Sequence, residues 1–174
     1  FIYDLQSQKI SPITRNFNPS VSQARWHSDG HIYITATDTD YIRLFRYHPN
    51  GNIERINCPG DIIRQLSLAS HGSIGFYSAS GTSNPAEIFE LDLQRATAEK
   101  WMAPAKNAYR DVVFGEVTEW YYSYKKGTVI QGRYYLPADF DPGQQYPLIV
   151  YYYGGTTPVQ ISFGGRYPFH LLAA

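Results

Sequence analysis

The segment Gln23-Ala-Arg-Trp-His-Ser-Asp-Gly30-His-Ile-Tyr33 decides the fold, because a similar segment follows at Gln65-Leu-Ser-Leu-Ala-Ser-His-Gly72-Ser-Ile-Gly75. The glutamine and the glycine of the first copy both recur 42 residues later. Each copy places a polar turn that ends in glycine before a run of strand-favouring residues, and glycine supplies the backbone freedom that such turns need. The spacing therefore predicts two copies of one structural unit.

Both copies continue with a strand, a polar loop, a second strand, a turn and a last short strand. A period of about 40–45 residues with four short strands is typical of β-propeller blades. Two or three blades do not close a ring, because propellers have about four to eight, and an open antiparallel meander or sandwich stays as the alternative. The predicted strands are His31–Ala36, Tyr41–Tyr47 and one within 50–56 in the first copy, and Ser73–Ser78, Glu87–Asp92 and one within 94–101 in the second, while Phe1–Leu5 with Gln8–Ile10 resembles the end of a third copy.

The composition favours β-structure and excludes several function classes. Aromatic residues make up 16% of the 174 residues, and their side chains fit a pleated, half-buried surface. The 15 basic and 15 acidic residues include no basic block, so neither nucleic acid nor an anionic membrane is expected as a partner. The single cysteine, Cys58, excludes an internal disulfide and a multi-cysteine zinc site.

The chain also lacks signals for a membrane or for secretion. Its apolar runs are shorter than the roughly 18 residues of a membrane span, so a soluble protein of the cytoplasm or periplasm is expected. The chain opens at Phe1, inside a strand-like run and without a signal peptide. A fragment of a longer protein is therefore expected.

After residue 106 the pattern changes from repeats to a hairpin. Trp101–Ala108 shows no alternation and contains a central proline, which is typical of a connector. Two aromatic-rich runs, Val117–Tyr124 and Thr128–Tyr135, then flank Lys125-Lys-Gly127, where the glycine suits the positive φ of a tight turn. We therefore predict two parts, residues 1–106 and residues 107–174.

The second part contains an apolar run that stops at a double glycine, Tyr146-Pro-Leu-Ile-Val-Tyr-Tyr-Tyr-Gly-Gly-Thr-Thr-Pro158. Leu148–Tyr153 are six strand-favouring residues without a charge, which predicts a strand buried on both faces, as in an open α/β sheet. Ligands and chemistry collect at the carboxyl ends of such strands. Arg166–Ala174 is predicted to begin a helix, with Pro168 in its first turn.

The sequence lacks the signatures of a complete catalytic centre. Gly-x-Ser-x-Gly, the strained turn that presents the nucleophile of an α/β-hydrolase, is absent, and Ser80 and Ser162 are predicted to be loop serines. An Asp-Gly turn signal separates His27 from His31, so a helical metal pair is not expected, and His170 is expected to pack beside the helix. Nucleotide and calcium motifs are absent too, so no cofactor or metal is predicted.

Tyr153 is the candidate catalytic residue of this chain. A tyrosine in an aromatic strand ordinarily packs against its neighbours. Tyr153 stands directly before Gly154-Gly155, however, and bare glycine backbone leaves room for a substrate beside the phenol. The hydroxyl is therefore predicted either to pack or to donate a hydrogen bond to an oxyanion that develops in a cleft.

Taken in order, these parts resemble the prolyl oligopeptidase family of serine peptidases, near its dipeptidyl peptidase IV and acylaminoacyl peptidase branches. The resemblance implies the C-terminal blades of a β-propeller in residues 1–106, which restrict access to short peptides, and the N-terminal part of an α/β-hydrolase domain in residues 107–174. It also implies that Tyr153 belongs to the oxyanion hole, whereas the nucleophile, Asp and His of the family have no counterpart in this chain. The resemblance rests on the repeats, the connector, the Lys-Gly hairpin, Leu136-Pro137, Tyr146-Pro147, Tyr153-Gly-Gly155 and Phe163-Gly-Gly-Arg-Tyr-Pro168.

The implied activity is peptide-bond hydrolysis through an acyl-enzyme in the longer protein, with this chain inactive by itself. Two alternatives stay open. A non-catalytic propeller that binds a protein partner would explain the repeats but not the run that ends in Gly154-Gly155. An esterase of the hydrolase fold would share the glycine turn, although such enzymes commonly carry His-Gly-Gly where this chain has Tyr-Gly-Gly. Because a cut propeller exposes blade faces, self-association of the chain is also expected.

Overall fold

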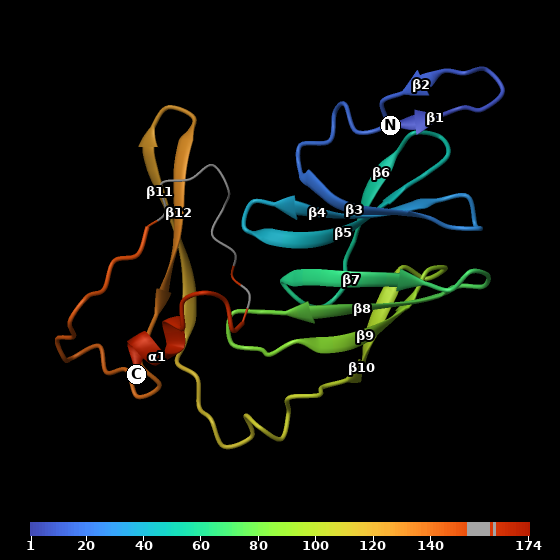
Figure 1. Ribbon diagram of the computed structural model, residues 1–174. Helices are drawn as coiled ribbons and strands as arrows, with labels where there is room; N and C mark the ends of the chain where they lie inside the picture. The colour runs from blue at the N-terminus through green and yellow to red at the C-terminus, as the bar shows by residue number, and fades with distance from the viewer. Residues whose placement is uncertain (153–160, 162) are drawn as a thin grey trace.

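The described residues form two four-stranded units, an N-terminal pair of short strands, a separate hairpin and one short helix (Figure 1). A computed structural model describes residues 1–152, 161 and 163–174. Strands dominate, which confirms the predicted mostly β fold, and none of the sheets formed by the described residues closes on itself. The elements are β1 (Ile2–Tyr3), β2 (Ile10–Ser11), β3 (Ser20–Trp26), β4 (Ile32–Asp38), β5 (Tyr41–Tyr47), β6 (Ile53–Ile56), β7 (Ile62–Leu68), β8 (Ile74–Ser80), β9 (Glu87–Asp92), β10 (Thr97–Met102), β11 (Val117–Lys125), β12 (Thr128–Tyr135) and α1 (Phe169–Ala173).

Unit 1 comprises β3–β6 and unit 2 comprises β7–β10, and in each unit successive strands pair antiparallel. β3 begins at Ser20 and β7 at Ile62, 42 residues later, and β4 and β8 keep the same offset. Gly30 and Gly72 lie in the corresponding turns, with φ angles of 87° and 92°. The predicted repeat and its glycine turns are therefore confirmed, because glycine adopts this φ at no steric cost.

The first strand of each unit is not among the predicted strands, because β3 and β7 overlap the segments Gln23–Gly30 and Gln65–Gly72 that are interpreted as polar turns. β3 carries exposed side chains at six of its seven positions, so it lacks the alternation that reveals a half-buried strand. In β7 the register shifts between Arg64 and Ser67, where Gln65 has a positive φ of 51°. β3 is therefore not recognisable from its pattern because it is exposed on both faces, and β7 is not because a bulge interrupts its alternation.

The units differ in the loop between their second and third strands. Thr39-Asp40 joins β4 to β5, whereas residues 81–86 join β8 to β9. The longer loop contains Thr82 and Ser83, which contact α1 at the other end of the chain. The extra residues of unit 2 therefore lie on the edge of the units that faces the hairpin and α1 (Figure 1).

The main core lies between the two units. Leu44 of β5, Ile62 of β7 and Leu91 of β9 are fully buried in one cluster. A parallel bridge pairs Ile42 with Ile62, so β5 and β7 join the units into one open sheet. Burying a side chain of this kind contributes about 1.5–3 kcal/mol, so this contact is a large source of stability.

A smaller core covers the opposite face of unit 1. There Ile34 and Phe45 are buried under apolar side chains of the N-terminal segment, among them Ile2 and Phe17. β1 and β2 of that segment pair antiparallel, as a tail of a further repeat would. Both faces of unit 1 are therefore covered.

The hairpin predicted within residues 117–135 is formed by β11 and β12, and Gly127 has a φ of 81° in its turn. Trp120 stands directly opposite Gly132. A Cβ atom at Gly132 would lie 2.2 Å from the Trp120 ring. The ring occupies the space of a side chain, so packing requires this glycine.

The predicted buried strand at Leu148–Tyr153 is wrong for its described residues. Residues 147–152 form no strand, and the Leu148 and Val150 side chains are 78% and 71% exposed. A strand buried on both faces must pair into a sheet whose two faces are covered by other elements, and none of the described strands pairs with this run. The local preference for a strand is not sufficient without those neighbours.

Helix α1 forms inside the predicted region 166–174, and Pro168 occupies its N-cap position. The helix packs beside β12, where the Phe169 and Tyr135 ring centroids lie 5.0 Å apart. Within the described ranges, no helix has both the length and the apolar character needed to cross a bilayer.

We propose that a second copy of this chain covers the face of unit 2 that the described residues leave exposed. On that face Ile74 and Trp101 are 48% and 57% exposed, and Phe76 packs edge-to-face on Trp101 with centroids 5.5 Å apart. Contiguous apolar surface favours association. Sedimentation velocity should therefore show dimers or larger species that Trp101→Glu weakens. A monomer at every concentration would contradict this expectation.

Candidate functional site

The candidate catalytic residue Tyr153 lies outside the described residues, as does Ser162. Before it, Tyr151 packs against Tyr167 and Phe169, with ring centroids 4.5 Å and 5.6 Å apart. After it, Ile161 is buried in the core cluster between the units. The described flanks of the candidate therefore contact the α1 segment on one side and the two units on the other.

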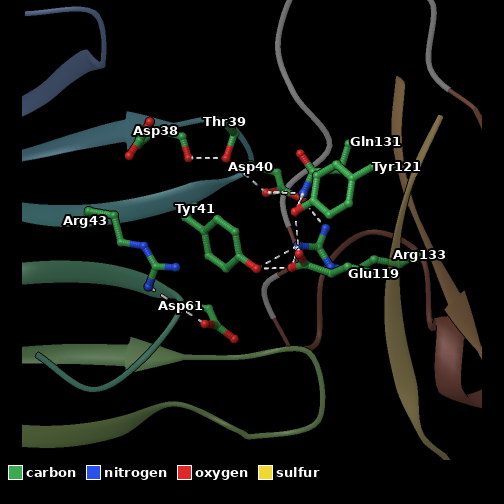
Figure 2. A network of polar contacts seen from close by, with 10 residues as sticks. All are labelled: Asp38, Thr39, Asp40, Tyr41, Arg43, Asp61, Glu119, Tyr121, Gln131 and Arg133. Carbon is green, nitrogen blue, oxygen red and sulfur yellow. Dashed lines mark hydrogen bonds and ion pairs between the residues drawn. The ribbon is translucent and has the colours of Figure 1, made fainter. Parts of the chain in front are cut away.

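A polar network joins the hairpin to the edge of the units (Figure 2). Arg133 of β12 pairs with Asp40 in the β4–β5 turn and donates to the Tyr41 hydroxyl at 3.2 Å. The same guanidinium donates to Glu119 Oε1 at 2.6 Å, and this oxygen also accepts from the Tyr41 hydroxyl. Tyr121 donates to the other oxygen of Glu119 at 2.7 Å. Groups from β5, β11, β12 and one turn thus share a single cluster.

The hairpin register places Glu119 of β11 beside Arg133 of β12. Glu119 and Arg133 are directly opposite each other, where unlike charges attract. The side chains of Arg133 and Asp40 are only 9% and 13% exposed. Charged groups with so little access to water need close partners of opposite sign, and Arg133 has two.

Burial and pairing shift the pKa values in this network. Burial alone would lower the pKa of Arg133, but the hydrogen bond to Asp40 and its charge raise it above the usual range. Hydrogen bonds from Tyr41 and then Tyr121 lower the pKa of Glu119. Burial, followed by the bond to Glu119, raises the pKa of Tyr41. At neutral pH Arg133 is therefore a cation, Glu119 an anion and Tyr41 a neutral phenol.

Arg43 extends the network along the boundary between the units. Its guanidinium carbon lies 3.9 Å from the Tyr41 ring centroid, and the group donates to the Gly60 carbonyl at 3.3 Å. Its nearest nitrogen is 3.9 Å from Asp61. Burial lowers the pKa of Arg43 and raises the pKa of Asp61. The hairpin, unit 1 and the start of unit 2 are therefore linked through charged and aromatic side chains.

His170 of α1 contacts the loop between β8 and β9 of unit 2. Its Nε2 lies 3.2 Å from the Thr82 carbonyl oxygen and 3.0 Å from Ser83 Oγ. Nε2 donates to the carbonyl in the tautomer that protonates this nitrogen, and it accepts from the Ser83 hydroxyl in the other tautomer. In either tautomer the imidazole links α1 to the loop between β8 and β9. Phe114 and Tyr135 pack on the imidazole at centroid distances of 4.8 Å and 5.2 Å, as expected of a packing histidine.

We expect His170 to make the folded state less stable in mild acid. Burial lowers the pKa of His170 from 6.5, so the unfolded chain binds this proton more readily. The contribution of the neutral form is complete above about pH 6.5 and is lost as the pH falls through the lowered pKa of the folded state. Urea denaturation at about pH 7.5 and about pH 5.5 should show a smaller loss in His170→Gln than in the wild type. Equal losses would contradict this role.

His27 has a structural role at the opposite edge of the units. Its Nε2 donates to the Ala69 carbonyl at 3.1 Å, and its Nδ1 accepts from the Asp29 amide at 3.3 Å. The ring thus links the β3–β4 turn to the β7–β8 turn.

The prediction that Ser80 is a loop serine is wrong, because Ser80 is the last residue of β8. In the described part of the chain, no three His, Cys, Asp or Glu side chains gather in a way that could hold a metal.

The sequence analysis did not identify Arg133, Glu119 or Asp40. A signal exists, because Arg133 is the single charge of β12 and Glu119 is the single acidic residue of β11. A lone charge inside an aromatic strand indicates a specific partner. That partner lies 93 residues away, in a turn that no local pattern connects to the hairpin.

Comparison with known proteins gives matches at the level of structure. No family model and no curated protein matches the sequence. The Pyrococcus horikoshii acylaminoacyl peptidase matches with a TM-score of 0.67 and 15% identity over 82% of this chain and 21% of its own. The unliganded AtxE2 isopeptidase matches with a TM-score of 0.60 and 13% identity over 74% of this chain and 20% of its own. The chain therefore spans about a fifth of the length of these structures.

The shared fold includes more than the repeated units. A coverage of 82% exceeds what residues 1–106 of the 174 supply, so it extends into the part that carries the hairpin. The chain thus has a peptidase-like fold in which the repeated four-stranded units precede the part that carries the hairpin. More specifically, the chain has the fold of part of these two peptidase structures, which supports its resemblance to the prolyl oligopeptidase family.

Proposed function

We propose that this chain is part of a serine peptidase of the prolyl oligopeptidase family, which hydrolyses peptide bonds through an acyl-enzyme. In this proposal residues 1–106 are the last blades of its β-propeller, and residues 107–174 begin its α/β-hydrolase domain. The blades restrict access to short peptides. The nucleophile, its base and the orienting carboxylate come from other parts of the longer protein.

One observation carries this proposal: two repeated units occur together with a hairpin that contacts their edge. The acylaminoacyl peptidase of Pyrococcus horikoshii matches over 82% of this chain, which is more than the repeated units supply, and this supports the proposal. A free-standing binding propeller accounts for the units but not for the second part. Fold does not determine function by itself, so the proposal also relies on the Tyr-Gly-Gly motif at residues 153–155.

In the proposed reaction, this chain supplies an oxyanion donor. Attack of a serine hydroxyl on the peptide carbonyl places negative charge on the carbonyl oxygen. A preplaced donor stabilises that charge more than it stabilises the neutral carbonyl, which lowers the barrier. The phenol of Tyr153 would be this donor, and the bare backbone of Gly154-Gly155 would let the substrate approach it.

A fluorophosphonate probe tests the proposal, because it reacts with activated serine hydroxyls. The longer protein that contains this chain should be labelled and should release a chromogenic amine from short peptides but not from a folded protein substrate. Residues 1–174 alone should show neither reaction. A folded long protein without labelling or peptide turnover would support a non-catalytic binding module instead. Labelling with turnover of esters but not of amides would support an esterase.

A further inference from the structure

The hairpin has no backbone pairing with either unit among the described residues. β11 and β12 form a sheet of their own, whereas β3–β10 form another. An isolated two-stranded hairpin is only marginally stable in water. The hairpin therefore depends on side-chain contacts, which the described residues provide at the Arg133 network and around Tyr135 and His170.

We propose that Arg133 is the docking residue that holds the hairpin on unit 1, with Asp40 and Tyr41 as its receptor. Glu119 on the neighbouring strand accepts from this guanidinium and also from the Tyr41 hydroxyl, so its carboxylate lies between the two groups (Figure 2). Asp40 and Tyr41 then receive it from the unit 1 side. The joint would exist whether or not the chain belongs to a peptidase.

The geometry requires an arginine at this position. One guanidinium nitrogen bonds Asp40, and another bonds both Glu119 and the Tyr41 hydroxyl. A planar fork reaches two sides at once, whereas a lysine ammonium is a point charge that favours one side. With the cation removed, Asp40 and Glu119 remain as two carboxylates that face each other across the joint. Their repulsion and desolvation would then favour an undocked hairpin.

Asp40→Asn isolates docking from the stability of the hairpin itself. This change removes the charge on the unit 1 side and leaves the Glu119–Arg133 pair inside the hairpin intact. Hydrogen exchange of the whole chain would measure protection of the β11 and β12 amides. We expect their protection to fall about tenfold or more in both Asp40→Asn and Arg133→Gln. Protection in β4, β5 and β8 should stay unchanged.

Two further variants test the specificity of the joint. The double variant of Asp40→Asn and Arg133→Gln should lose no more protection than the more affected single variant, because both changes break the same ion pair between Asp40 and Arg133. Arg133→Lys should lie between the wild type and Arg133→Gln. Lys100→Gln is the matched control, because Lys100 pairs with Glu87 at 2.7 Å in unit 2, away from the hairpin. Lys100→Gln removes one positive charge, as Arg133→Gln does, and should leave the protection of the hairpin amides unchanged.

Two results would overturn the proposal. Unchanged hairpin protection in both Asp40→Asn and Arg133→Gln would show that the aromatic contacts around His170 hold the hairpin. A parallel loss of protection in the hairpin and in β4, β5 and β8 would show that Arg133 supports the units as a whole.

Discussion

Replacement of Tyr153 by phenylalanine should lower the kcat of the intact enzyme by about 10²–10³-fold, or about 3–4 kcal/mol, with little change in KM. Phenylalanine keeps the ring and its packing but removes the hydroxyl donor. A donor that acts on the oxyanion is used in the transition state and not in substrate binding, so kcat carries the effect. Steady-state kinetics with a short peptide substrate would measure it.

Tyr152→Phe is the matched control for this experiment. Tyr152 precedes Tyr153 directly, and its side chain is 84% exposed. Removing its hydroxyl should leave both kcat and the melting temperature near those of the wild type. If Tyr153→Phe folds normally and retains its kcat, Tyr153 has a packing role alone and the oxyanion assignment fails.

Leu91→Ala should lower the free energy of unfolding of this chain by about 2–5 kcal/mol. Leu91 is 0% exposed at the contact between the units, so the substitution removes apolar burial and leaves a cavity. Each kcal/mol lost should reduce the melting temperature by about 2–4 °C for a chain of this length. Urea denaturation followed by circular dichroism would give the free energy.

Leu148→Ala provides the comparison, because it is the same substitution at a side chain that is 78% exposed. It should change the free energy of unfolding by no more than about 0.5 kcal/mol. A loss as large as that of Leu91→Ala would place Leu148 in a core and would restore the buried strand predicted from residues 148–153.

Elements with a short-range signal are predictable from this sequence. The positions of Gly30 and Gly72, 42 residues apart, identify the repeat because a tight turn requires glycine at that point in each copy. Gly127 identifies the hairpin in the same way. In all three cases the information lies within a few residues of the turn that it forms.

Elements whose structure depends on distant neighbours are not predictable in this way. β3 is exposed on both faces, so its residues carry no pattern, and its pairing with β4 alone makes it a strand. Residues 148–150 show the opposite case, a strong strand preference that remains unpaired and exposed. Pairing between strands, and not local preference, decides both outcomes.

By itself the sequence determined the repeated units, the hairpin, the start of α1 and the motif that makes Tyr153 a candidate. The docking of the hairpin was decided by tertiary structure alone. Arg133 within a strand indicates that a partner exists, because a charge with 9% exposure is costly without one. Asp40 is that partner because the tertiary fold places the β4–β5 turn beside the hairpin. Electrostatic attraction depends on distance in space and not on separation along the chain.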